Sequence, residues 1–231
     1  AVGSNAEEKI VSMFPDANVL VQSDGVSEYF AACKVQHVAP HPHITSQLLS
    51  MNPLLKLDGL QLRGKQAIAL MAGLIGNHHV QHISFKNIGL DSLSVHALSI
   101  ALTTSPVQTN QATSASISAK VQTLDLSRNP VLFGTAQRSV GEGLTTINSI
   151  IKIINVAQIL STLRLAEVGL GDHDARALCD ALVATKRRPL RQLDLSGNRL
   201  CDRSSKKLAR LVLKYDGLSY LNLTWNLFGP A

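Results

Sequence analysis

The chain has 231 residues, of which 45% are hydrophobic and 4% aromatic, and a formal net charge of +6. No apolar run reaches the roughly 20 residues of a membrane span, and the first residues have neither the cationic start nor the apolar stretch of a secretory signal. The charge is modest for this length, so it permits an acidic partner without pointing to a specific nucleic-acid ligand.

The first 53 residues are predicted to form short helices. A helix over 7–14 ends before Pro15, because the residue before a proline disfavours helical backbone. An extended segment over 18–21 and helices over 27–34 and 44–51 follow, and the first strand spans 54–57. We expect residues 1–53 to form a helical cap over the first repeat, since an uncovered end would expose apolar core and a strand edge.

From residue 54 onward one pattern recurs, and its clearest copy runs from Leu190 to Leu200 as L-x-x-L-x-L-x-x-N-x-L. Leu193 and Leu195 alternate as on a short strand, so both side chains enter one core. Asn198 then turns the chain and can bond backbone groups that no neighbouring strand satisfies. Six copies are predicted, centred on Leu55, Ile83, Leu124, Leu163, Leu193 and Leu221.

Each of the first five strands is followed by apolar residues at helical spacing, so the repeating unit is one strand plus one helix. Two insertions explain the irregular spacing of the strands: an uncharged surface loop over 103–119, and a segment over 132–141 between strand and helix. The sixth copy stops before any helix, so we expect the parent protein to continue. The predicted buried helix faces are Ala67, Leu70, Met71 and Leu74; Val95, Leu98 and Leu102; Ile147, Ile150, Ile151 and Ile154; Ala175, Leu178, Cys179 and Leu182; and Ser205, Leu208, Ala209 and Val212.

The predicted fold class is therefore α/β, a leucine-rich-repeat solenoid over 54–231 with a curved parallel sheet on its concave side and helices on its convex side. The repeats resemble the helix-containing class found in ribonuclease inhibitor, in Ran GTPase-activating protein and in cytosolic sensors with nucleotide-binding domains. More narrowly, the segment 29–34 with Val38 and Pro40, followed by 59–60 and 64–70, resembles intracellular leucine-rich-repeat proteins of ciliated and flagellated organisms. This resemblance implies a helical N-terminal cap and a cytosolic, cytoskeletal or axonemal scaffold without catalysis.

The chain departs from the repeat pattern at the asparagine position. Three copies have Asn129, Asn198 and Asn226 there, whereas the other three have Leu60, Ile88 and Val168. An apolar side chain fills the core but cannot bond the backbone, so we expect these turns to satisfy their backbone groups in another way.

The strands of such a solenoid line its concave face, which is the default binding surface. Mixed charge along it suits a protein epitope better than a polyanion, although the same side chains could be merely solvated. Tyr220 and Trp225 either form a binding hot spot or pack against a further repeat. The predicted partner-binding residues are Lys56, Asp58, Ser84, Lys86, Asp125, Arg164, Asp194, Asn222, Tyr220 and Trp225.

A basic patch is predicted on the outer face of the last helix, opposite its apolar residues. Two interpretations fit this patch. It is a solvated helix face, or it contacts an acidic protein surface, a tubulin tail or anionic lipid. Its members are Arg203, Lys206, Lys207, Arg210 and Lys214, with Lys186, Arg187 and Arg188 nearby.

The sequence predicts no catalytic residue, cofactor or metal. The histidines at 37, 41 and 43 and at 78, 79 and 82 lack cysteine or carboxylate partners at ligand spacing, so we expect them to be solvated. Cys33, Cys179 and Cys201 have no paired spacing, which favours reduced thiols in the cytoplasm. The predicted function is a non-enzymatic scaffold for a protein partner; the alternative is a regulatory module, such as a small-GTPase activator or the sensing repeats of a larger receptor.

Overall fold

The computed structural model describes residues 25–62, 64–75, 77, 79–103, 120–133, 145–185 and 189–229. The predicted helix over 7–14 and the extended segment over 18–21 lie outside these residues. So do 104–119 and 134–144, which hold most of the two predicted insertions.

Two helices precede a regular alternation of strands and helices. They are α2 (Val26–Gln36) and α3 (Pro42–Leu49), close to the predicted spans. Each strand together with the helix that follows it is called a unit below, and the sixth unit is described through residue 229. The alternating elements are β1 (Leu54–Lys56), α4 (Gly64–Ile75), β2 (His82–Ser84), α5 (Ser92–Thr103), β3 (Thr123–Asp125), α6 (Thr146–Val156), β4 (Thr162–Arg164), α7 (Asp172–Ala184), β5 (Gln192–Asp194), α8 (Asp202–Lys214) and β6 (Tyr220–Asn222).

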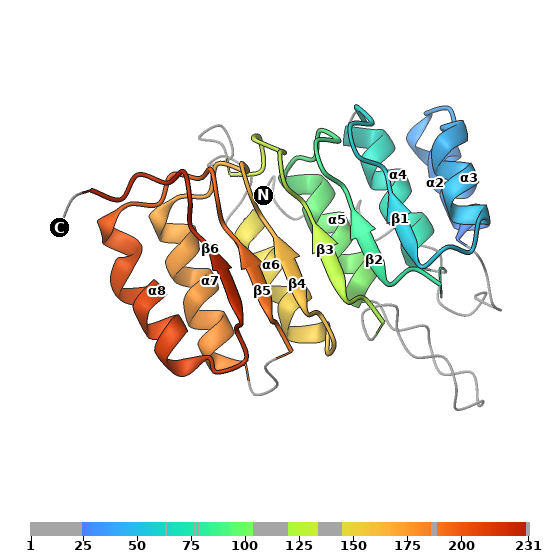
Figure 1. Ribbon diagram of the computed structural model, residues 1–231. Coiled ribbons are helices and arrows are strands. Elements are labelled where there is room, and N and C mark those ends of the chain that lie inside the picture. The colour runs from blue at the N-terminus through green and yellow to red at the C-terminus, as the bar shows by residue number, and fades with distance from the viewer. Residues whose placement is uncertain are drawn as a thin grey trace, which may run out of the picture.

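The six strands form one parallel sheet in chain order, from β1 to β6. The central residue of each strand pairs with the central residue of the next, as Leu55 does with Ile83 and Leu193 with Leu221. Helices α4 to α8 lie along one side of the sheet (Figure 1), because parallel strands need a crossover connection and each helix covers the apolar side of its strand. The chain is an α/β protein with a sequential arrangement compatible with a solenoid.

The core lies between the sheet and the helices. The predicted buried faces of α4, α5 and α7 are buried in full, and on α6 only Ile151 remains partly exposed. Burying one leucine or isoleucine side chain contributes about 1.5–3 kcal/mol, so a repeated set of these residues gives each unit its stability. The central strand residues Leu55, Ile83, Leu124, Leu163 and Leu193 are all buried.

Helix α8 contradicts the predicted face. Of the residues predicted to be buried only Leu208 is buried; Ser205 and Ala209 are exposed, and Val212 is 58% exposed. The buried residues are Ser204, Leu208 and Leu211. Helix α7 packs against one side of α8, and no described helix packs against the other. The covered face of α8 is therefore turned toward α7, and the flank with Val212 stays open.

Asparagine side chains join consecutive units. The side-chain oxygen of Asn129 accepts hydrogen bonds of 3.0–3.2 Å from three consecutive backbone amides of the preceding unit, those of Ile88, Gly89 and Leu90. In the same way Asn198 accepts from the amide of Val168, at 3.2 Å. The turns at Ile88 and Val168 thus use the asparagine of the next unit. At Leu60, where the next unit has Ile88 instead, the backbone amide of Leu60 donates to the carbonyl of Leu57 at 3.1 Å and that of Leu62 donates to the carbonyl of Ile88 at 2.8 Å.

Helices α2 and α3 pack at the β1 end of the molecule. Helix α2 packs against α4, and the approach is close because Gly73 has no side chain. A Cβ at this position would lie 2.9 Å from the carbonyl oxygen of Gly25 and 3.0 Å from the Cβ of Tyr29. On α3, Gln47 Oε1 accepts the backbone N–H of Lys56 at 3.4 Å. A side chain thus takes the place of a neighbouring strand at this edge of the sheet.

Candidate functional site

The side of the sheet that the helices leave open, named the strand face here, carries two rows of side chains. Strand register aligns the first row, so that each member pairs with its neighbour in the next unit. The first row is Lys56, Ser84, Asp125, Arg164, Asp194 and Asn222. The second row lies two residues further along each strand and is Asp58, Lys86, Ser127, Ala166, Ser196 and Thr224. The structure thus brings the predicted strand residues together, one from each unit in each row.

In two ion pairs of the strand face, the positive side chain is more exposed than the negative one. The side chains of Lys56 and Arg164 are 62% and 45% exposed, whereas those of Asp58 and Asp125 are 28% and 12% exposed. The pairs are loose: Lys56 Nζ lies 3.8 Å from Asp58, and Arg164 Nη1 lies 3.7 Å from Asp125. Exposed ion pairs of this kind contribute about 0–1 kcal/mol, so the cations remain available to a partner.

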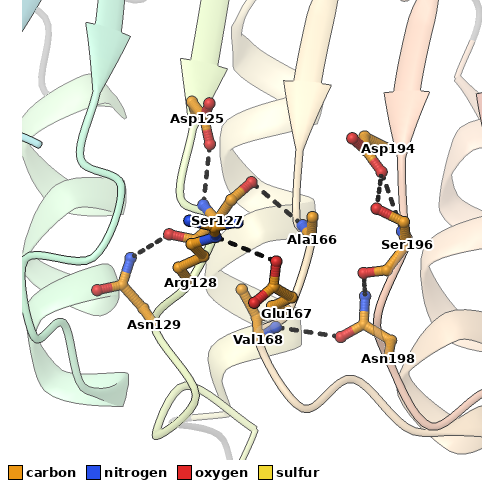
Figure 2. Close-up of polar contacts among 10 residues, drawn as sticks. All are labelled: Asp125, Ser127, Arg128, Asn129, Ala166, Glu167, Val168, Asp194, Ser196 and Asn198. Carbon is orange, nitrogen blue, oxygen red and sulfur yellow. Dashed lines mark hydrogen bonds and ion pairs between the residues drawn. The ribbon is translucent and has the colours of Figure 1, made fainter. Parts of the chain in front are cut away.

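The acidic side chains of the first row are held by their own turns. Asp125 Oδ1 accepts the backbone N–H of Ser127 at 2.9 Å, and Asp194 Oδ1 accepts both the N–H and the hydroxyl of Ser196, at 2.9 and 2.7 Å (Figure 2). Asp followed two residues later by Ser is a known turn-forming pattern. The sequence D-L-S contains this signal, although these turn bonds are not among the predictions made from the sequence. These carboxylates shape the turns, which leaves the cations as the freer charges.

A third row, which is not among the predicted site residues, lies where the chain leaves each strand. Its members all have a positive φ, between 55° and 76°. Glycine and asparagine adopt this backbone readily, whereas other residues do so at about 1–2 kcal/mol each. We name this row the turn edge; it consists of Gly59, Asn87, Arg128, Glu167, Gly197 and Trp225. The signal that could have revealed it is its constant place, one residue before the asparagine position.

At the centre of the turn edge, Arg128 Nε donates a hydrogen bond of 3.1 Å to Glu167 Oε1, joining the third and fourth units (Figure 2). Both side chains are 54% exposed. They border a cleft of about 520 Å³. The cleft is lined by Asn87, Arg128, Pro130, Glu167, Gly169, Gly197 and Arg199.

Tyr220 and Trp225 lie on and just after β6, where they are 52% and 88% exposed. Strand β6 pairs with β5 on one side, and no strand of the described residues pairs with its other side. Leu227, 65% exposed, belongs to the same end of the molecule. Both predicted roles of the two aromatic residues, a hot spot and packing against a further repeat, agree with this exposure.

The predicted basic patch lies on α8. Lys207 Nζ binds both carboxylate oxygens of Asp180 on α7, at 2.7 and 2.6 Å, and Arg210 Nη1 lies 3.8 Å from the same carboxylate. Arg203, Lys206 and Lys214 are exposed. Lys207 and Arg210 therefore share a partner on α7, whereas Arg203, Lys206 and Lys214 face solvent. Residues 186–188 lie outside the described part of the chain.

The described histidines and cysteines form no metal site: no group of three or more His, Cys, Asp or Glu among the described residues could hold a metal ion. His82 Nδ1 lies 3.1 Å from Thr123 Oγ1 on the neighbouring strand, and His78 lies outside the described residues. Burial raises the pKa of the Cys33 thiol, and burial with the nearby Asp180 charge raises the pKa of Cys179 to about 12. Both thiols are therefore protonated at neutral pH and poor nucleophiles.

None of the described helices combines the length and apolar character needed to span a bilayer. In comparisons with known proteins, no protein-family model matches the chain, and no curated protein matches it either.

Proposed function

We propose that this chain is a non-enzymatic scaffold that binds a protein partner through its strand face, and that its units are leucine-rich repeats of the ribonuclease-inhibitor-like class. The observation that carries the proposal is the unbroken register of the sheet. It places one polar side chain from each of six strands in a single row on a face that the helices leave uncovered. A row of this kind gives an extended surface with a fixed spacing of side chains, which suits recognition of another polypeptide.

The exposed cations of the strand face are the residues that we expect to make the strongest contacts. The carboxylates of Asp125 and Asp194 on this face already accept hydrogen bonds from backbone amides of their own turns. An arginine or lysine that is exposed before binding and covered by a partner contributes more than a charge left at the rim. We propose a cytoplasmic setting, in a cytoskeletal or flagellar assembly, on the resemblance alone.

The test is affinity capture by the chain and by two variants with the same net charge. The first variant reverses three cations of the strand face, Lys56→Glu, Lys86→Glu and Arg164→Glu. The second reverses three cations of α8, Arg203→Glu, Lys206→Glu and Lys214→Glu. The proposal expects a partner that the first variant loses and the second keeps. The opposite result would assign the partner to α8 instead.

A further inference from the structure

The turn edge has large side chains at positions where the backbone favours glycine. Arg128 and Glu167 have φ angles of 59° and 55°, in the left-handed region that L side chains rarely adopt. Gly197, with φ 64°, occupies the equivalent position in the next unit, so the turn itself requires no side chain. A strained conformation kept at an exposed residue indicates that the side chain has another use.

Backbone contacts of these two residues hold the turns without help from their side chains. The amide of Arg128 donates to the carbonyl of Ala166 at 2.8 Å, and the amide of Glu167 donates to the carbonyl of Ser196 at 2.9 Å. Asn129 adds its bonds to the preceding unit. The guanidinium and carboxylate groups therefore lie outside the framework that closes the turns.

The ion pair leaves the terminal fork of Arg128 open. Only its Nε donates to Glu167, and among the described residues no acceptor binds the two Nη groups. Arg199, a second exposed arginine, lines the same cleft and has no ion pair with a described residue. A planar guanidinium held at one nitrogen presents its remaining donors in the geometry that binds a carboxylate with two parallel hydrogen bonds.

We infer that the turn edge at Arg128, Glu167 and Arg199 recognises a carboxylate of an acidic polypeptide segment, with Glu167 as the residue that positions Arg128. The inference rests on the proposed function, because it places the partner's acidic residue beside the strand face. A single carboxylate fits better than a doubly charged phosphate, because Glu167 reduces the positive charge of the cleft. Arg164, an exposed cation of the strand face on the same unit as Glu167, extends the surface for an acidic chain.

The test uses the whole chain and a displayed library of random peptides. Peptides selected on the chain are synthesised, and their affinities are measured by fluorescence anisotropy. We expect them to be rich in Asp and Glu, and we expect Arg128→Gly and Arg199→Ala each to weaken binding at least tenfold. Arg203→Ala, which removes an exposed arginine from α8, should leave the affinity unchanged.

Two further measurements separate recognition from stability. Because glycine relieves the left-handed strain, Arg128→Gly should melt at the same temperature as the chain or higher while binding less. Glu167→Gln keeps an oxygen that accepts from Arg128 Nε, so it should retain binding, whereas Glu167→Gly should weaken it. Equal affinities for these two Glu167 variants would show that Glu167 does not position Arg128.

The failures of the two proposals are distinguishable. If the selected peptides are not acidic, or bind Arg128→Gly and Arg199→Ala as well as the chain, the inference is wrong. If the triple reversal at Lys56, Lys86 and Arg164 abolishes binding in that case, the strand face is supported as the binding surface and the turn edge is not. If only Arg128→Gly and Arg199→Ala lose binding, the carboxylate site at the turn edge is supported and binding through the strand face is not.

Discussion

Asn129 shows at the residue scale how one side chain serves two units. Its oxygen accepts from three amides of the second unit, and its nitrogen donates to Phe85 of that unit at 2.9 Å and to Leu126 of its own at 2.8 Å. Asn129 is fully buried, so water cannot replace these hydrogen bonds if the side-chain amide is removed.

Replacing Asn129 by alanine should therefore lower the free energy of unfolding by about 3 kcal/mol or more, because several buried backbone groups lose their partners. Urea unfolding followed by circular dichroism measures this loss. The matched control is Asn226→Ala: Asn226 is partly exposed and accepts from one amide of the preceding unit, that of Leu200 at 3.1 Å. Its loss should be nearer 1 kcal/mol, and equal losses at the two positions would contradict this account.

The sequence predicts part of this residue-scale picture. The position of Asn198 in the repeat indicates that its side chain bonds the turn backbone, and the structure confirms it with bonds to the carbonyls of Leu195 and Ser196 at 2.9 and 3.3 Å. The reach into the preceding unit could not be predicted, because a repeat pattern places a residue within its own unit and says nothing of how units stack. The turn edge was missed because Arg128 and Glu167 differ in residue type from the glycines at equivalent positions.

At the element scale, α8 shows the limit of periodicity. Ser205, Leu208 and Val212 share helical spacing, and so do Ser204, Leu208 and Leu211, so both faces satisfy the pattern. The neighbouring helix decides between them, and the sequence of α8 alone does not contain that neighbour. Helices α4, α5 and α7, which have a described helix on either side, match their predicted faces.

A pair of substitutions tests the observed face of α8. Leu211→Ala should lower the free energy of unfolding by about 3 kcal/mol, because Leu211 is fully buried. Val212→Ala removes an exposed side chain and should change stability by less than about 0.5 kcal/mol. Chemical denaturation of both variants measures the difference. A larger loss in the free energy of unfolding for Val212→Ala than for Leu211→Ala would support the predicted face instead.

The connection between α7 and α8 predicts a dependence on pH. Asp172, at the start of α7, accepts the backbone N–H of Cys201 at 2.8 Å and its thiol at 2.7 Å, just before α8. Burial alone would raise the pKa of Asp172, but the hydrogen bonds from Cys201 and Ser204 and the charge of Arg203 hold it below the usual 3.8. Because the folded pKa lies below the unfolded one, the carboxylate stabilises the fold above about pH 4, and this contribution is lost as the pH falls through the folded value.

Asp172→Asn should therefore lower the melting temperature at neutral pH, and the difference from the parent chain should shrink as the pH falls below 3.8 and through the lower folded pKa of Asp172. Thermal melts across this pH range measure it. Burial raises the pKa of the neighbouring Asp174, which has the opposite effect on stability, but Asp174 is present in both proteins and cancels in the comparison. A difference that stays constant with pH would show that the carboxylate charge is not the cause.

At the scale of the whole molecule, the number and order of the strands could be predicted, because each strand carries its own copy of the pattern. All six expected centres lie side by side in one sheet. The two ends of the sheet could not be predicted from the pattern. The β1 edge receives Gln47 from α3, and this contact depends on the packing of α2 and α3 rather than on any repeat.

Hydrogen exchange should reveal this difference along the sheet. Amides of β3 and β4 lie between paired strands and a buried core, whereas β6 pairs on one side and its Leu221 is only partly buried. Exchange in β6 should therefore be faster, because local opening exposes little apolar surface there. Exchange measured by mass spectrometry on peptic fragments tests this. Equal protection of β6 and β3 would mean that the sheet opens only as a whole.

The asparagine bonds between units also bear on how such a chain can be rearranged by gene duplication or deletion. If the third unit were excised, the turn at Ile88 would face the turn at Val168, and neither position has an amide side chain. The backbone amides of Ile88 and Leu90, two buried residues, would lose the acceptor that Asn129 supplies, and so would the amide of Gly89, which is exposed. The modules of this protein are thus not interchangeable, and their succession along the chain is constrained by what each one supplies to the module before it.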